Sequence, residues 1–353
     1  MNREKIVHGG DWAGFEEGYG FMPVDFSANV SPLGMPEAVR KASEEALGQA
    51  ERYPDPLCRE LVREIAASED TDSGFIMCGN GAADLVFRLC TALRPERTLI
   101  TAPTFAEYEA AVKASGGSVV RYRLHEENDF RLGEDFPDAV TCDTDLVILC
   151  QPNNPTGITE PRGFLMRALE KCRETDTMLM IDECFNDFLD EPHMHTMKEL
   201  VGEYDNLLIL RSFTKMYGMA GLRLGYCICS DTSLLERMRL AGQPWAVSHI
   251  AQRAGLAALH EKEYVSDVRR LIAKERRWLI WRLQLLHVRV IEGEANFILF
   301  KSLPGLDVKM KEKGFLIRNC GNYEGLEEGW YRIAVRTRQE NEGLMKALEE
   351  AIG

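Results

Sequence analysis

The sequence predicts an α/β fold in which a mostly parallel sheet is covered by helices and followed by a smaller α+β domain. Three observations predict it. Short apolar runs alternate with amphipathic stretches from about residue 36 to about residue 230, as in strands joined by helical crossovers. Several of the runs are continuously apolar, which is typical of strands buried on both faces. After about residue 230 a long helical region precedes short strand-like segments.

The elements are expected in the following order. The first thirty-odd residues, rich in Gly, Pro and aromatic side chains, look irregular, and Pro36 then opens a helical pattern, PEAVRKASEEAL, because proline suits the first turn. Strands are expected at residues 75–78, 98–101, 145–150, 178–181, 207–210 and 224–229, with helices at 82–93, 105–115 and 162–175 between them. The long helical region ends near residue 286, and VRVIEG, NFILFK, FLIRNC and YRIAVR follow.

Five consecutive predicted strands are each followed by residues that can do chemistry. Ligands of an open parallel sheet bind outside the carboxyl ends of its strands, so these segments are expected to meet. They supply a glycine loop, an aromatic ring, an amide, a carboxylate and a lysine. In chain order they are Gly79-Asn80-Gly81, Ala102-Pro103-Thr104-Phe105, the run QPNNPTG at residues 151–157, Asp182-Glu183, and the run RSFTK that ends at Lys215.

Each of these features alone has an ordinary structural explanation. The glycine loop can be a plain tight turn, Asp182 can cap a helix or pair with a core arginine, and Lys215 can be a solvated loop lysine. Functionally, a glycine loop before a helix offers backbone N–H groups to a phosphate, and a desolvated lysine forms Schiff bases. Together, the phosphate cradle, the acid for a pyridinium nitrogen, the stacking aromatic and the lysine fit pyridoxal 5′-phosphate.

Composition limits the classes of partner. The 353 residues are 45% hydrophobic and 28% charged, and 56 acidic against 42 basic side chains give a formal net charge of −14. Such a surface argues against binding to nucleic acid or to an anionic membrane. Because no run reaches the roughly 18 apolar residues of a bilayer span and the N-terminus lacks a signal-peptide pattern, we expect a cytoplasmic protein.

The ten cysteines are scattered and form no C-x-x-C pair. We expect buried free thiols in a reducing compartment, because several lie in apolar runs such as DLVILC and GYCICS. His193 and His195 alone do not supply the paired ligands of a zinc site, so no metal is expected.

The motifs GNG, PNNPTG, IDE, SFTK and GLRLGY, in this order, resemble the class I/II aminotransferase-like family of fold-type I pyridoxal phosphate enzymes over essentially the whole chain. The resemblance implies a large cofactor-binding domain at residues 36–240, a small domain at 241–353, and an N-terminal segment, 1–35, that covers the active site. It is strongest to threonine-phosphate decarboxylases of cobalamin biosynthesis and next to histidinol-phosphate aminotransferases. The segments behind that preference include HGG at residues 8–10, DFSAN at 25–29, RYPD at 52–55, Pro244-Trp245, IRNC at 317–320 and Phe185, where the aminotransferases usually have tyrosine.

The resemblance also implies roles for individual residues. Lys215 would carry the cofactor, Asp182 would pair with its ring nitrogen, Asn154 would bond its phenolic oxygen and Phe105 would stack on its ring. The cofactor phosphate would be held by Gly81, Ala82, Ser212 and Arg223, and by Tyr53 of the neighbouring subunit in a homodimer with shared active sites. Arg332 would bind the substrate carboxylate, and Arg318, with His8 and Asn29, the substrate phosphate; Asn154 also counts among the substrate-binding residues.

The reaction implied is decarboxylation of L-threonine O-3-phosphate to 1-amino-2-propanol O-2-phosphate. An aminotransferase similar to the histidinol-phosphate enzymes shares the cofactor residues and differs in which bond at Cα is aligned. A non-catalytic cofactor-binding domain of a transcription regulator would need an appended basic DNA-binding domain, and a degenerate relative should have lost Lys215, Asp182 or Arg332. Several ordinary structural roles also stay open: Arg332 and Arg318 on the solvent face of strands, His8 on a disordered tail, and Phe185 in the core.

Overall fold

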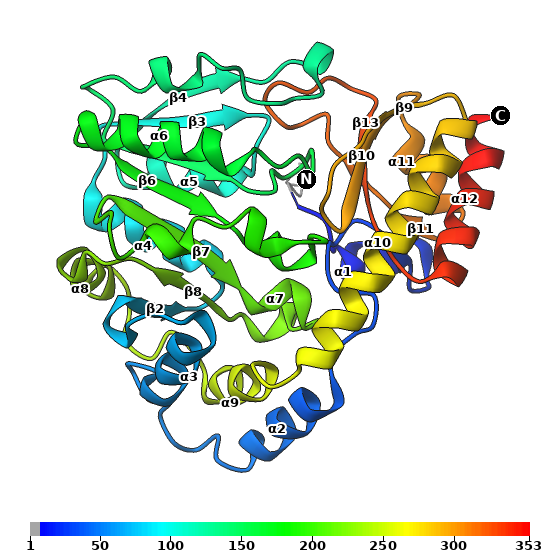
Figure 1. Ribbon diagram of the computed structural model, residues 1–353. Coiled ribbons are helices and arrows are strands. Elements are labelled where there is room, and N and C mark those ends of the chain that lie inside the picture. The colour runs from blue at the N-terminus through cyan, green and yellow to red at the C-terminus, as the bar shows by residue number, and fades with distance from the viewer. Residues whose placement is uncertain (1–7) are drawn as a thin grey trace.

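The computed structural model describes residues 8–353, and a seven-stranded sheet is its centre (Figure 1). All strands of this sheet run parallel except β8, which is antiparallel to both of its neighbours. In spatial order the strands are β2 (Ile76–Gly79), β8 (Gly225–Ile228), β7 (Leu207–Ser212), β6 (Met178–Asp182), β5 (Leu146–Cys150), β3 (Arg97–Ala102) and β4 (Ser118–Arg123).

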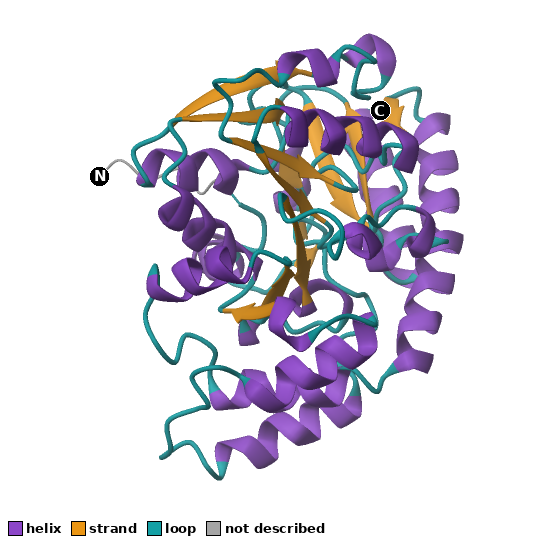
Figure 2. Cartoon of the chain, turned by 60° about the vertical axis from the view of Figure 1, so that its left-hand side comes forward, coloured by secondary structure: helices purple, strands orange, loops and turns teal. Residues whose placement is uncertain are grey.

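Helices lie on both sides of this sheet (Figure 2). Alternate residues of a strand point to opposite faces, and the apolar clusters separate accordingly. One cluster joins Ile181 and Ile209 to α3 (Arg59–Glu69), α6 (Arg162–Glu174) and α9 (His249–Ala258). The other joins Met180 and Leu210 to α4 (Ala82–Leu93), α5 (Ala106–Ala114) and α8 (Thr232–Leu240). Helix α2 (Glu37–Leu47) packs on α9.

The C-terminal part of the chain forms a second core around a four-stranded antiparallel sheet. The strands are, in spatial order, β12 (Arg318–Asn319), β13 (Trp330–Ala334), β10 (Phe297–Lys301) and β9 (Arg289–Ile291). Their apolar side chains pack with α10 (Lys262–Leu285), α11 (Leu306–Glu312) and α12 (Arg338–Ile352). Strand β1 (Val24–Asp25) pairs with β11 (Phe315–Leu316), which joins the N-terminal segment to this part of the molecule.

The six predicted strands of the large sheet and the three helices between them are confirmed, with ends that differ by one or two residues. Strand β4 was not predicted, because its residues, SVVRYR, are half-exposed at the sheet edge rather than continuously apolar. The N-terminal stretch is not wholly irregular, since α1 (Trp12–Tyr19) forms there with Asp11 as its N-cap. Pro36 lies just before the helix that it was expected to begin.

The long helical region is interrupted, which the sequence pattern did not indicate. It comprises α8, α9 and α10, and residues 241–248, AGQPWAVS, separate the first two of these helices. Figure 1 shows α10 running from the large sheet to the small one. Within residues 8–353, no helix is long and apolar enough to cross a bilayer. The predicted domain boundaries at residues 35 and 240 stay a prediction.

Candidate active site

A cavity of about 520 Å³ lies at the carboxyl ends of the central strands, and we call it the central cavity. Its wall comes from those strand ends, the first turn of α4, the N-terminal segment and strands β12 and β13. Most of the residues to which sequence reasoning assigned a role meet there: His8, Asn29, Ala82, Phe105, Asn154, Asp182, Ser212, Lys215, Arg223, Arg318 and Arg332. Their individual roles stay predictions.

Asp182 ends β6 as a buried carboxylate that two donors hold in place. The Tyr108 hydroxyl donates to its Oδ2 at 2.6 Å, and the Cys184 N–H donates to its Oδ1 at 2.9 Å. Burial, together with the charge of Asp182, raises the pKa of Tyr108 well above its usual value, so this phenol keeps its proton and remains a donor. Among the described residues, no arginine pairs with Asp182, whereas Arg211 pairs with the adjacent Glu183.

Lys215 lies on α7 (Phe213–Met216), a single turn that directly follows β7. Ser212 starts this turn by accepting from the Thr214 N–H at 3.2 Å. Lys215 is half-buried at the cavity, and desolvation lowers its pKa, with the positive charges of Arg223 and Arg332 acting in the same direction. A lowered pKa makes more of the amine neutral, which is the nucleophilic form. The interpretation of Lys215 as a solvated loop lysine is therefore wrong.

The loop between β2 and α4 forms a tight cradle beside Arg223. Gly81 has φ = +80°, and a Cβ there would lie 2.5 Å from Nη2 of Arg223. A Cβ on Gly225 would lie 2.6 Å from the backbone nitrogen of Ala82. Glycine is thus required at both positions for the helix start and the guanidinium to approach each other. The free N–H groups that begin α4, together with Arg223, make this end of the cavity positive.

Arg332 and Arg318 face each other on neighbouring strands of the small sheet. Arg332 is 6% exposed; its Nη1 donates to Oδ1 of Asn154, its Nη2 donates to the Ser27 carbonyl at 3.0 Å, and its Nε has no hydrogen-bond partner among the described residues. Arg318, also buried, donates to Oδ1 of Asn322 at 2.7 Å. Because both side chains are buried at the cavity, the interpretation that they lie on a solvent face is wrong.

The Arg332 bond fixes how Asn154 presents its amide. Its Oδ1 accepts from Arg332, so its Nδ2 is left as a donor. Phe185 lies on the same cavity wall and packs edge-on against Phe297, with 5.0 Å between ring centroids. It is therefore both a core residue and a lining residue.

His8 lies over Phe105 at the mouth of the cavity. Its Nε2 lies 2.6 Å from Oε1 of Glu107, and its ring centroid lies 5.8 Å from that of Phe105. Tyr53, in contrast, lies outside the central cavity; it is 81% exposed and its ring is 4.8 Å from that of Trp245. A single chain does not test the prediction that Tyr53 reaches the neighbouring subunit.

The sequence reasoning assigned no role to several residues that line the cavity, among them Tyr108, Glu107, Thr214 and Tyr323. Tyr108 carried a detectable signal, since it lies one helical turn after Phe105 and such residues share a helix face. Glu107 lies in the segment FAEY at residues 105–108, which also resembles the decarboxylases, but its contact with His8 depends on how the N-terminal segment folds back. Cys150 and Cys184 also line the cavity, and burial is the main cause that raises the pKa of both thiols.

Comparison with known proteins places these features in a family. The family model "Aminotransferase class I and II" matches residues 22–348. A threonine-phosphate decarboxylase of Salmonella typhimurium is 34% identical over 98% of this chain and 96% of that protein, and a histidinol-phosphate aminotransferase of Symbiobacterium thermophilum is 33% identical over 94% and 91%.

Solved structures with these two names also resemble this chain. An L-threonine-O-3-phosphate decarboxylase from Porphyromonas gingivalis superposes with a TM-score of 0.83 at 28% identity, covering 93% of this chain and 98% of that one. A histidinol-phosphate aminotransferase from Clostridium acetobutylicum gives a TM-score of 0.86 at 28% identity, covering 92% and 98%. Because the family match spans nearly the whole chain, the chain belongs to the class I and II aminotransferase family, has its fold-type I architecture and depends on pyridoxal 5′-phosphate.

Proposed function

We propose that the chain is a pyridoxal 5′-phosphate-dependent decarboxylase of L-threonine O-3-phosphate, which it converts to 1-amino-2-propanol O-2-phosphate. The observation that carries the proposal is the pair of buried arginines, Arg318 and Arg332, which face each other on one wall of the central cavity. A ligand bearing a carboxylate and a phosphate a few bonds apart complements two guanidinium groups held in this way. Threonine phosphate is such a ligand.

The residues present fit the cofactor. The cradle at Gly81 leaves no room for a side chain beside Arg223, which suits a phosphate held by backbone N–H groups and Arg223. Ser212 and Ala82 lie on the same cavity wall. Asp182 can keep a pyridinium nitrogen protonated, and Phe105 can stack on the ring. Asn154, whose oxygen is engaged by Arg332, offers its Nδ2 to a phenolic oxygen.

When bound, pyridoxal 5′-phosphate supplies an electron-accepting ring for whichever bond at the substrate Cα stands perpendicular to it. The protein decides which bond that is. Arg332 would hold the carboxylate and Arg318, with His8 and Asn29, the phosphate, which fixes rotation about the bond to nitrogen. Lys215 in its ammonium form, made more acidic by the lowered pKa, would deliver the proton that replaces carbon dioxide at Cα and would become the neutral amine.

The second candidate is an aminotransferase, because relatives with that name match as much of the chain as the decarboxylases do. It would use the same cofactor residues with a different bond aligned at Cα. Phe185 favours the decarboxylase, since the aminotransferases usually carry tyrosine at that position. Serine phosphate is a plausible further substrate, because a pocket for one methyl group discriminates by only about 1–3 kcal/mol.

Supplying O-phospho-L-threonine to purified protein with and without 2-oxoglutarate separates the two candidates. A decarboxylase releases carbon dioxide whether or not the keto acid is present. Glutamate formation without carbon dioxide would overturn the proposal and support the aminotransferase. The Lys215→Ala variant serves as the matched blank in both assays. In a separate test of the cofactor site, borohydride reduction should trap pyridoxal on the peptide that contains Lys215.

We also propose that the active unit is a homodimer in which Tyr53 reaches the partner's cofactor phosphate. The exposed aromatic pair of Tyr53 and Trp245 supports this, because large apolar side chains are seldom left in water without a partner surface. Mixing Tyr53→Ala and Lys215→Ala chains under subunit exchange should give more activity than the two parents together, since each hybrid dimer would contain one intact site. Simple additivity of the parent activities would contradict shared sites.

A further inference from the structure

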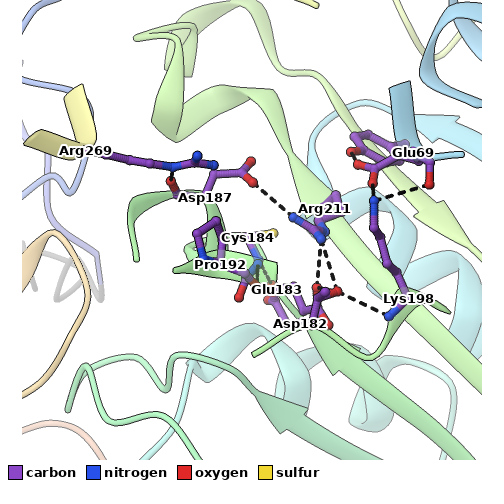
Figure 3. Close-up of polar contacts among 12 residues, drawn as sticks. Glu69, Asp182, Glu183, Cys184, Asp187, Pro192, Lys198, Arg211 and Arg269 are labelled. Carbon is purple, nitrogen blue, oxygen red and sulfur yellow. Dashed lines mark hydrogen bonds and ion pairs between the residues drawn. The ribbon is translucent and has the colours of Figure 1, made fainter. Parts of the chain in front are cut away.

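Behind the cavity, on the opposite face of β6 and β7, lies a buried cluster of charges that we call the back-face network (Figure 3). Its centre is the ion pair of Arg211, 5% exposed, with Glu183, 1% exposed, at 3.0 Å. The cavity residues and the network residues are sequence neighbours: Asp182 precedes Glu183, and Ser212 follows Arg211. The full network consists of Glu69, Glu183, Asp187, Thr196, Lys198, Arg211 and Tyr226.

Strand geometry explains why neighbours in sequence face opposite ways. Asp182, Leu210 and Ser212 line the central cavity, and Asp182 pairs with Leu210 in the sheet. Because side chains alternate across a strand, Arg211 points to the other face. Glu183, one residue beyond Asp182, points there too, and its N–H still donates to the Leu210 carbonyl at 2.9 Å. A shift of Glu183 or Arg211 would therefore also move a residue that lines the cavity.

Arg211 ties three segments together. Besides Glu183, it donates to Oδ1 of Asp187 at 3.1 Å and to Oγ1 of Thr196 at 3.2 Å. Glu183 in turn accepts from the Thr196 hydroxyl at 2.7 Å and from the Met197 N–H at 2.8 Å. The chain that follows β6 is thus fastened to β7 at several points, all of them behind the cavity.

The electrostatics favour the charged forms of Arg211 and Glu69, whereas burial raises the pKa of Glu183 even though Arg211 and its hydrogen-bond donors oppose that shift. Although burial opposes it, the carboxylates of Glu183, Glu69 and Asp187 raise the pKa of Arg211 well above its usual value. Burial likewise opposes ionisation of Glu69, but Arg211 and Lys198 outweigh it and lower its pKa. Lys198 lies 2.6 Å from Glu69, which also accepts from the Tyr226 hydroxyl. Removing Arg211 would leave three carboxylates with Lys198 as the only cation of the network.

The network also reaches the helix that leads to the small sheet. The Asp187 carbonyl accepts from Nε of Arg269 on α10 at 2.6 Å, while the Asp187 carboxylate holds Arg211. Three residues further on, Asp190 pairs with Arg276 of the same helix at 3.3 Å. Figure 3 shows Arg269, Asp187 and Arg211 in sequence along one line of contacts. The segment after β6 is therefore fixed to β7 on one side and to α10 on the other.

We propose that Arg211 and Glu183 are positioning residues: their ion pair, made on the face away from the cofactor, sets the placement of Asp182 and Ser212 against the cofactor. This rests on the proposed cofactor contacts of Asp182 and Ser212, but not on which reaction follows. The forked guanidinium is essential to it, because only arginine can reach Glu183, Asp187 and Thr196 at once.

The test compares Arg211→Met, Arg211→Lys and the double variant Arg211→Met with Glu183→Gln. We expect the dissociation constant of pyridoxal 5′-phosphate to rise about tenfold or more in Arg211→Met and to be only partly rescued by lysine. Visible circular dichroism of the bound cofactor, per unit absorbance, should fall in parallel because the ring is less firmly oriented. The melting temperature of the apo protein is measured alongside to follow folding.

The double variant separates positioning from simple stabilisation. It removes the carboxylate that Arg211 pairs with most closely and leaves Glu69 beside Lys198, so the melting temperature should partly recover relative to Arg211→Met, whereas cofactor affinity and circular dichroism should stay low. The matched control is Glu275→Gln, which breaks a buried carboxylate's pair with Arg338, at 2.9 Å, in the small-domain core. It should lower the melting temperature and leave the cofactor signals unchanged.

The proposal is overturned if folded Arg211→Met protein binds and orients the cofactor like the parent, or if affinity recovers together with stability in the double variant. These readouts need no substrate. A chain that proved to be an aminotransferase would leave them intact, whereas borohydride labelling away from Lys215 would remove the site on which the inference rests.

Discussion

The two faces of the β6–β7 ends differ in how their buried polar groups are satisfied. On the front, in the central cavity, Lys215 has a lowered pKa, and Nε of Arg332 and Oδ1 of Asn29 have no hydrogen-bond partner among the described residues. On the back, Glu183 is bonded by Arg211, Thr196 and the Met197 N–H. Nε of Arg211 has no hydrogen-bond partner among the described residues, but its two other nitrogens bond Glu183, Asp187 and Thr196. Both faces are buried and both carry charge.

The difference teaches which buried charges belong to a ligand. A buried polar group without a partner costs free energy, so a cluster of such groups around one cavity indicates that something else completes them. A buried group whose partners are all protein is part of the scaffold. The back-face network is not thereby irrelevant to chemistry, since it holds the same two strands.

The largest effect is expected at Lys215. Lys215→Ala removes the proposed covalent anchor and proposed proton donor, so turnover of O-phospho-L-threonine should fall by about 10³-fold or more. Carbon dioxide release under saturating cofactor measures it. Glu275→Gln, a buried change in the small-domain core away from both faces, serves as control. Substantial turnover in Lys215→Ala would contradict the proposed catalytic role of Lys215 in the central cavity.

Arg332→Lys should have the next largest effect. The charge is kept, but the fork that bonds Asn154 and Ser27 is lost, and hydrogen bonds to charged groups are worth about 1.5–3 kcal/mol. We expect kcat/KM for the phosphorylated amino acid to fall by about 10- to 100-fold. Arg336→Lys, four residues on and paired with Glu340 at 2.6 Å, is the matched control. Equal losses in the two variants would contradict a ligand-binding role for Arg332.

A smaller effect is expected at Tyr108. Tyr108→Phe removes the hydroxyl that donates to Asp182 at 2.6 Å and should weaken cofactor binding by about tenfold. Fluorescence titration of the apo protein with pyridoxal 5′-phosphate measures it. Thr196→Val removes the equivalent hydroxyl behind the sheet, which donates to Glu183 at 2.7 Å, and should change affinity less. A larger loss of cofactor affinity in Thr196→Val than in Tyr108→Phe would contradict the inference that the front face binds the cofactor directly.

The smallest expected effect concerns pH. The folded apo protein holds Lys215 with a lowered pKa, chiefly because of burial, so between this value and the ordinary lysine pKa of about 10.4 the unfolded chain binds more protons. Its stability should therefore rise with pH across that window. Lys215→Met has no titrating group at this position, so it should be more stable than the parent protein at neutral pH. The difference in stability between the two proteins should become smaller as pH rises. Melting temperatures of both apo proteins check the sign.

The large sheet was predictable because its strands are buried on both faces. Residues 146–150 and 207–210 are continuously apolar, and short runs of this kind are typical of parallel strands that helices cover on both sides. Strand β4 lies at the edge of the sheet and is half-exposed, so its apolar content gave too weak a pattern. Helix α1 contains two glycines and starts from a local cap on Asp11, which hydrophobic periodicity does not detect.

The site was predictable where its residues follow strands and not where they depend on distant packing. Asp182 and Ser212 end strands, so sheet topology alone brings them together. The contact of His8 with Glu107 joins residues 99 positions apart and depends on how the N-terminal segment crosses the cavity. The back-face network could not be predicted for a related reason. The sequence places Glu183 beside Asp182 and Arg211 beside Ser212, but it does not show that Glu183 and Arg211 point to the opposite face of the sheet.

The pairing of Arg318 with Arg332 has a consequence for selectivity. Residues directly opposite each other on antiparallel strands have their Cα atoms about 5 Å apart, and a sheet holds this spacing more rigidly than loops would. In the proposed function, two guanidinium groups mounted in this way would select ligands by the separation between two anionic groups on one small molecule. Serine phosphate and threonine phosphate have the same separation, so both would bind, and selection between them would depend on the apolar surface that meets one methyl group.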